Sequence, residues 1–100
     1  MSKFVYVFTG STMAATPEEQ QSVMQKWGLW FGTIGSALLD EGNPFGDSAI
    51  VSAAGVTPGA PAGGYTIIDA ASLQDATDLA KGCPVLAEGG AVEVYEALQM

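Results

Sequence analysis

The sequence predicts an α+β fold, a ferredoxin-like βαββαβ sandwich in which two helices cover one face of a four-stranded antiparallel sheet. Three observations predict it. The chain begins with a β-branched and aromatic run, a capped amphipathic helix follows, and the last third alternates between strand, helix and strand signals. The 100 residues are expected to form one domain, 1–100, near the lower limit of what buries an adequate core unaided.

Residues 3–9, KFVYVFT, are predicted to form the first strand. Both alternations are apolar, as expected of a central strand that is covered on both faces. The aromatic alternation consists of Phe4, Tyr6 and Phe8, and the other of Val5 and Val7. We expect the valines to point to the helices and the aromatic residues to point to the opposite face of the sheet.

A long helix is predicted from Thr16 to about Asp40. Thr16 is an N-cap residue, proline follows at the first turn, and two acids face the positive end of the helix dipole. The buried stripe is expected to contain Val23, Trp27, Phe31, Ile34 and Leu38. Three glycines lie beside this stripe, at positions 28, 32 and 35. They indicate either a close backbone approach or a poorly optimised helix.

The middle of the chain is predicted to contain one short strand and a long connection. Glycine and proline at 42 and 44 end the first helix, and residues 48–53 are expected to form the second strand. Residues 54–64 are rich in glycine, proline and alanine, and are interpreted as a connector. This segment lacks the lysine of a phosphate-binding loop.

The last third of the chain has the clearest signals for where its helix and strands begin and end. Residues 65–70 are predicted to form the third strand, and Ser72 caps the second helix with Asp75 three residues later. Gly82 and Pro84 are expected to end this helix. Residues 91–97 form the last strand. Val92 and Val94 are expected to face the helices.

Charge and composition exclude several classes of partner. The net charge is −8, with three lysines and neither arginine nor histidine, so nucleic acid and membrane surfaces are not expected as partners. No segment approaches the roughly 20 apolar residues of a membrane span. The start of the chain lacks the features of a signal peptide, and Cys83 has no disulfide partner, so a cytoplasmic location is expected. Neither a cofactor nor a metal site is indicated.

The predicted sheet has one uncovered face, which suggests self-association. Phe4, Tyr6, Phe8 and Tyr95 are expected to lie on it as a large aromatic patch. A two-fold homodimer formed through the sheet faces would bury this patch.

Several motifs of the C-terminal third also carry a family resemblance. The strand, the Ser-Leu-Gln-Asp-Ala helix start, the Cys-Pro pair and the last strand, within residues 64–96, resemble the YCII-related family of small bacterial proteins. The resemblance extends over nearly the whole chain and implies a dimeric α+β barrel. The activity suggested for some members uses a histidine–aspartate pair, which a chain without histidine lacks. The Asp-Gly-Pro-Phe loop of another branch is also missing, with only Asn-Pro-Phe-Gly at 43–46.

The last strand offers the candidate catalytic residues. Glu93 and Tyr95 share one strand face, which is expected to lie near Tyr6 on the first strand. In an apolar dimer cleft the Glu93 carboxyl would suit proton transfer. The alternative is an ordinary acid at a wet sheet edge or an interface hydrogen bond.

A ligand site is predicted around the same face. The candidate ligand-binding residues are Tyr6, Phe8, Asn43, Phe45, Ser48 and Tyr95, and ordinary turn chemistry is the alternative for the loop residues. The leading hypothesis is a homodimer that binds a small apolar or neutral metabolite. The others are a cofactor-free enzyme that uses Glu93 with Tyr6 or Tyr95, and a structural or regulatory protein-interaction module.

Overall fold

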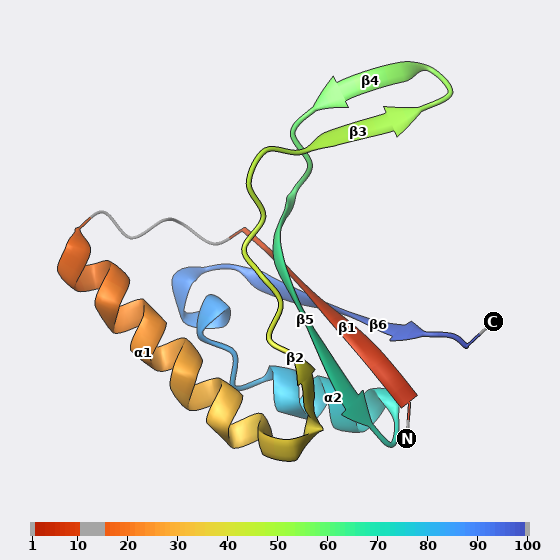
Figure 1. The fold of residues 1–100 in the computed structure, drawn as a ribbon. Helices are drawn as coiled ribbons and strands as arrows, with labels where there is room; N and C mark the ends of the chain where they lie inside the picture. The colour runs from red at the N-terminus through yellow and green to blue at the C-terminus, as the bar shows by residue number, and fades with distance from the viewer. Residues whose placement is uncertain (1, 11–15, 100) are drawn as a thin grey trace.

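The first strand, β1 (Ser2–Thr9), is the centre of the main sheet (Figure 1). It pairs antiparallel with β5 (Ala62–Ala70) on one side and with β6 (Ala91–Ala97) on the other. A short strand, β2 (Leu38–Asp40), pairs antiparallel with β5, so the sheet order is β2-β5-β1-β6. This computed structural model describes residues 2–10 and 16–99. The predicted α+β class and the four-stranded antiparallel sheet are confirmed.

Both predicted helix starts are confirmed by their caps. The first helix, α1 (Pro17–Ile34), begins after Thr16, whose side-chain oxygen accepts a hydrogen bond from the Glu19 amide at 3.1 Å. The second, α2 (Leu73–Ala80), begins after Ser72, whose hydroxyl oxygen accepts from the Asp75 amide at 3.1 Å. Each cap satisfies one of the amides that a helix N-terminus leaves without a partner.

The first helix is shorter than the sequence predicts. It ends at Ile34, and the next residue, Gly35, has φ +62°, which breaks the helical path. A 3₁₀ turn, η1 (Gly35–Ala37), then leads into β2. Leu38 therefore lies on a strand beside β5 and not on the helical stripe. The helical spacing gave a wrong prediction for Leu38, because an apolar residue fits the buried side of a helix and of a strand equally well.

The prediction that residues 48–53 belong to the main sheet is wrong. Within this range, β3 (Ala49–Ser52) pairs antiparallel with β4 (Gly55–Pro58) as a separate two-stranded hairpin. We call these residues, 49–58, the arm, and Figure 1 shows the arm projecting away from the sheet and helices. The predicted connector, 54–64, thus contains β4 and the start of β5. The chain order between the two helices is therefore β2, β3, β4 and β5.

The core lies between the sheet and the two helices. β1 contributes its aromatic alternation, α1 contributes Trp30 and Ile34, and α2 contributes Ala76 and Ala80. The Trp30 indole NH donates to the Leu79 carbonyl at 3.0 Å, which ties α1 to α2. A second 3₁₀ segment, η2 (Pro84–Glu88), precedes β6.

The glycines of α1 have space around them. A Cβ atom at Gly28 or Gly32 would meet nothing within 4 Å, so the alternative of a close backbone approach is wrong at both positions. The close approach lies instead at Gly42, where φ is +73° and a Cβ would overlap the Tyr65 carbonyl. Glycine is therefore required where the chain leaves β2 and passes β5.

Candidate functional site

Within residues 2–10 and 16–99, no helix or strand covers the sheet face opposite the helices, and the strand register places two rows of side chains across this face. One row runs from Tyr65 through Val7 to Glu93, because Val7 is the cross-strand partner of both. The second row runs from Ile67 through Val5 to Tyr95. We call these six residues the open face. Strands lie about 4.8 Å apart, so each row spans about 10 Å, the size of a small molecule.

The open face is apolar at its centre and polar at one side. Val5, Val7 and Ile67 are half-buried although no helix covers them, whereas Glu93 and Tyr95 on the outer strand are exposed. A third row, of Asp69, Lys3 and Ala97, continues the face toward one end. The apolar centre is the kind of surface that another molecule covers.

The predicted orientation of β1 is wrong. Phe4, Tyr6 and Phe8 point to the helices and are buried, and the two valines lie on the open face. The reason is aromatic packing: Phe8 meets Trp27 edge to face at 4.9 Å between ring centroids, and Tyr6 stacks on Trp30 at 5.8 Å. The large rings fill the space between sheet and helices that valines would leave empty. The orientation predicted for Val92 and Val94 is confirmed, since both pack against the core.

Tyr6 is therefore separated from Glu93 and Tyr95. It is 0 % exposed, and its hydroxyl donates a hydrogen bond to the Ala76 carbonyl of α2. Burial, together with the nearby Cys83, raises the pKa of Tyr6 to about 12. A phenol that is enclosed and hydrogen-bonded in this way is a structural group, and the structure does not assemble the predicted trio of acid–base residues.

Glu93 and Tyr95 do form a pair. They lie two positions apart on the same side of β6, and the Tyr95 hydroxyl donates to Glu93 Oε1 at 3.1 Å. This hydrogen bond and the charge of Glu93 raise the pKa of Tyr95. Glu93 is exposed in the single chain, so the apolar enclosure on which its predicted proton-transfer role depends is not present there. The pair supplies a carboxylate acceptor beside a phenol.

The predicted loop residues lie at the opposite side of the open face. Phe45 stacks on Tyr65, with ring centroids 5.7 Å apart, and its amide donates to the Gly63 carbonyl at 2.8 Å. The Asn43 carbonyl accepts from the Tyr65 amide at 3.3 Å. Phe45 thus adds an aromatic wall to the row that contains Tyr65, while Asn43 positions the backbone.

Ser48 has a structural role that the sequence did not indicate. Its hydroxyl oxygen accepts from the Ala60 amide at 2.7 Å, and its carbonyl accepts from the Gly59 amide at 2.8 Å. These bonds close the base of the arm. Ser48 therefore holds the arm and is not shown beside the open face.

The structure adds four residues to the candidate site that sequence reasoning missed. They are Val5, Val7, Tyr65 and Ile67. The sequence of residues 65–68, YTII, does indicate that Tyr65 and Ile67 share one side of a strand. Thr66 and Ile68 lie on the other side, which is buried. No sequence feature stated which alternation the helices cover.

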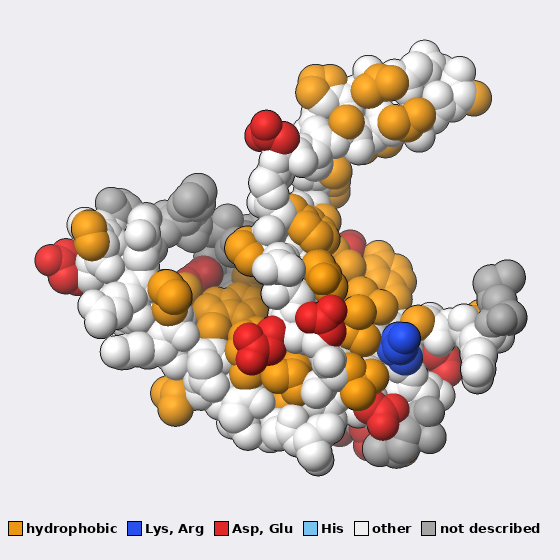
Figure 2. Space-filling view, in the orientation of Figure 1, with side chains coloured by type: hydrophobic (Ala, Val, Ile, Leu, Met, Phe, Trp, Pro, Cys, Tyr) orange, Lys and Arg blue, Asp and Glu red, His pale blue; other side chains and the backbone are white. Residues whose placement is uncertain are grey.

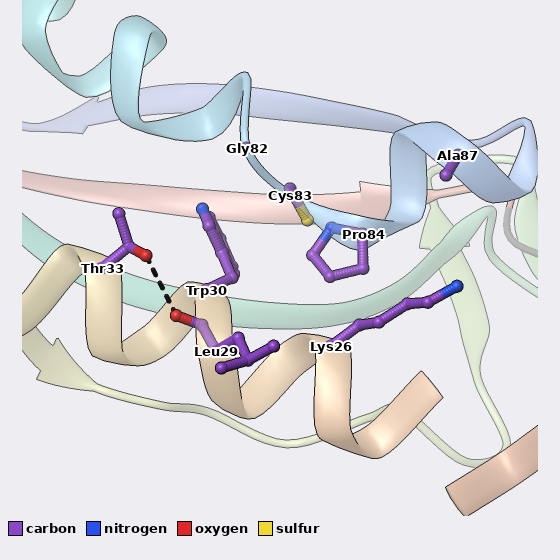
Figure 3. A pocket seen from close by; sticks show the side chains of 8 residues that line it. All are labelled: Lys26, Leu29, Trp30, Thr33, Gly82, Cys83, Pro84 and Ala87. Carbon is purple, nitrogen blue, oxygen red and sulfur yellow. Dashed lines mark hydrogen bonds between the residues drawn. The ribbon is translucent and has the colours of Figure 1, made fainter. Parts of the chain in front are cut away.

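A groove of about 370 Å³ lies on the helix side, between α1 and the segment from Gly82 to Ala87 (Figure 3). Its lining is mainly apolar and includes Trp30 and Pro84, with Lys26 reaching along one side. Cys83 borders this groove but is 3 % exposed, and burial raises its pKa to about 11. The thiol is therefore a poor nucleophile.

Metal ligands do not gather in the part of the chain that the structure describes. Within residues 2–10 and 16–99, no group of three or more Cys, Asp or Glu side chains is arranged to hold a metal ion. In the same residues, no helix combines the length and the apolar character that crossing a membrane requires.

Comparison with known proteins returns no relative. No family model matches the chain, and neither the curated proteins nor the solved structures contain a match. The geometry of the open face is therefore the basis for a functional proposal.

Proposed function

We propose that this protein is a cytoplasmic homodimer that binds a small apolar or neutral molecule at the open face. The observation that carries the proposal is the apolar strip of Val5, Val7 and Ile67, which lies uncovered between an aromatic stack and a hydrogen-bonded carboxylate–phenol pair. The proposal includes the ferredoxin-like topology, the α+β barrel formed by two sheets, and membership of the YCII-related family that the motifs of residues 64–96 resemble.

Self-association through the open face is supported by the physics of sheets. A sheet with one face on a core and the other in water normally alternates apolar and polar residues. Here the central strand carries valine on the outer alternation as well. A second copy placed with its open face toward this one would cover these side chains, and the ligand would be held between the two sheets. Two-fold pairing is the commonest arrangement of this kind.

The ligand chemistry follows from the groups at the two sides of the face. Phe45 and Tyr65 present stacked rings, which suit a flat or apolar group. Glu93 accepts hydrogen bonds, so it can bind a ligand donor such as a hydroxyl or an amide. Anionic ligands are disfavoured by the net charge of −8.

A direct test uses Nile red, a neutral apolar dye, as a probe of the open face. The wild-type protein should enhance the fluorescence of the dye in a saturable manner. Val7→Lys introduces a charge at the centre of the face and should weaken dye binding at least about tenfold, since an unpaired charge resists burial. Gln21→Lys, which adds the same charge on the exposed surface of α1, is the control and should bind as the wild type does. Equal binding by both variants would contradict the proposal.

The hydrogen bond between Tyr95 and Glu93 also favours a second candidate, a cofactor-free enzyme with these two groups as acid and base. Enclosure by the second copy would supply the apolar setting that Glu93 lacks in the single chain. Glu93→Gln keeps the shape of the side chain and removes its basicity. If a turnover found by metabolite screening persists at the wild-type rate in Glu93→Gln, this candidate is eliminated.

A further inference from the structure

The arm has one face that is entirely apolar. Its register pairs Ala49 with Pro58 and Val51 with Val56, and these four residues share a side of the hairpin because they alternate with Ile50 and Thr57. Val51 is 77 % exposed and Val56 is 68 % exposed. All eight strand residues of the arm are exposed, so no part of the chain that the structure describes covers this apolar face.

The arm is held in its projecting position by its base. The Gly59 amide donates to the Ser48 carbonyl at 2.8 Å and the Ala60 amide donates to the Ser48 hydroxyl oxygen at 2.7 Å. Just beyond, Pro44 and Gly64 form a β-bridge. The arm is therefore presented outward by hydrogen bonds and is more than a loose connection. A two-stranded hairpin alone is marginally stable in water, so packing against another surface would stabilise it.

Charge indicates what that other surface is. Residues 48–68 contain no Asp, Glu, Lys or Arg, although the chain as a whole carries −8. In Figure 2 the visible side of the arm shows hydrophobic side chains, and acidic side chains lie at the base of the arm and on the body. Two identical acidic chains repel each other over most of their surfaces. They avoid this repulsion where one contributes a neutral, apolar segment.

We propose that the arm is an intersubunit arm, whose apolar face of Ala49, Val51, Val56 and Pro58 packs against a second copy of this chain. Two-fold symmetry makes the contact reciprocal, so each dimer contains it twice. This inference rests on the self-association proposed above and adds a second contact to the open face. The arm carries no charged side chain, so its contact with the second copy is made through apolar surface.

The test compares two matched variants by sedimentation velocity over a range of protein concentrations. Val51→Asp places a charge on the apolar face of the arm, and Thr57→Asp places the same charge on the opposite face. Val51→Asp should raise the dimer dissociation constant at least about tenfold, because the effect occurs at two symmetric contacts. Thr57→Asp should leave it within about twofold of the wild type. Near-ultraviolet circular dichroism of the buried Trp30 checks that the body of each variant is folded.

A deletion provides the second measurement. The arm is replaced by two glycines between Ser48 and Gly59, whose backbones are already joined by a hydrogen bond. The body should keep its tryptophan signal and lose dimer affinity at least as strongly as Val51→Asp does.

The outcomes separate this inference from the open-face dimer. If the arm variants weaken the dimer, the inference is supported. If Val7→Lys dissociates the dimer while Val51→Asp and the deletion do not, the arm inference fails and the open-face interface stands. If the arm variants dissociate the dimer and Val7→Lys does not, the arm inference stands and the open-face interface fails. A wild-type chain that sediments as a monomer at every concentration overturns both.

Discussion

The hydroxyl of Tyr6 in β1 donates a hydrogen bond to the backbone carbonyl of Ala76 in α2, 70 positions further along the chain. Tyr6 also stacks on Trp30 of α1. One side chain of the central strand therefore contacts both helices. This arrangement fixes which face of β1 is covered, and it leaves the valine alternation for the open face.

Tyr6→Phe should lower the free energy of unfolding by about 1 kcal/mol, the typical net value of one buried hydrogen bond. The ring and its stacking on Trp30 are kept, so the fold should not change. Urea denaturation followed by tryptophan fluorescence measures the difference. Tyr95→Phe, which removes a hydroxyl from an exposed pair, is the control and should change stability by less than about 0.5 kcal/mol. A loss of less than about 0.5 kcal/mol in Tyr6→Phe would show that the Tyr6 bond adds little stability.

Alkaline pH should destabilise the wild type through the same residue. Burial raises the pKa of Tyr6 from 10.0 to about 12, so the folded state holds this proton more tightly than the unfolded state does. The resulting stability is present below pH 10 and is lost as the pH rises toward 12. Tyr6→Phe lacks this contribution, and its free energy of unfolding should approach that of the wild type as the pH rises. A gap between them that stays constant up to pH 12 would contradict this account.

Cys83 should react slowly in the folded protein. Burial raises its pKa from 9.0 to about 11, which lowers the thiolate fraction at pH 8 about 100-fold, and the side chain is almost fully enclosed. A disulfide reagent that releases a chromophore should label the native chain at least about 100-fold more slowly than the urea-unfolded chain. Labelling at similar rates would mean that the segment around η2 opens readily.

Two glycine substitutions should have opposite effects. Gly28→Ala adds a methyl group to an open position inside α1 and should stabilise the fold by about 0.5–1 kcal/mol. Gly42→Ala should destabilise it by about 3 kcal/mol or more, because φ is +73° and the new Cβ overlaps the Tyr65 carbonyl. Thermal and urea denaturation of both variants test this. A tolerated Gly42→Ala would mean that β2 does not lie against β5 as described.

The sequence predicted the elements whose signals are local. The capping residues Thr16 and Ser72 correctly predicted the starts of the two helices. Residues 91–97 were correctly predicted as the last strand. The orientation of β1 was not predictable in this way, because both alternations of the strand are apolar. It depends on Trp27 and Trp30, which lie more than 18 positions away and provide the rings against which Phe8 and Tyr6 pack.

The sequence predicted the part of the candidate site that lies on one strand and not the part that depends on the orientation of β1. Glu93 and Tyr95 share a strand face by simple alternation, as the sequence predicted, and the structure adds the hydrogen bond between them. The neighbours of Glu93 and Tyr95 on β1 depend on which side of β1 faces the helices. Because Tyr6 faces the helices, these neighbours are Val7 and Val5. The first strand of the arm, β3, lies within the predicted second strand, but its partner β4 was missed because it lies in the run 54–64, which is rich in glycine, proline and alanine and resembles a loop.

The central claim is that a second copy of the chain covers the open face, and native mass spectrometry of freshly purified protein tests it most directly. Gentle transfer preserves subunit association and tightly bound small molecules. We predict a species of twice the chain mass, with any bound ligand visible as a defined additional mass. A spectrum that contains only the monomer, at concentrations where the purified protein is folded, would contradict the claim.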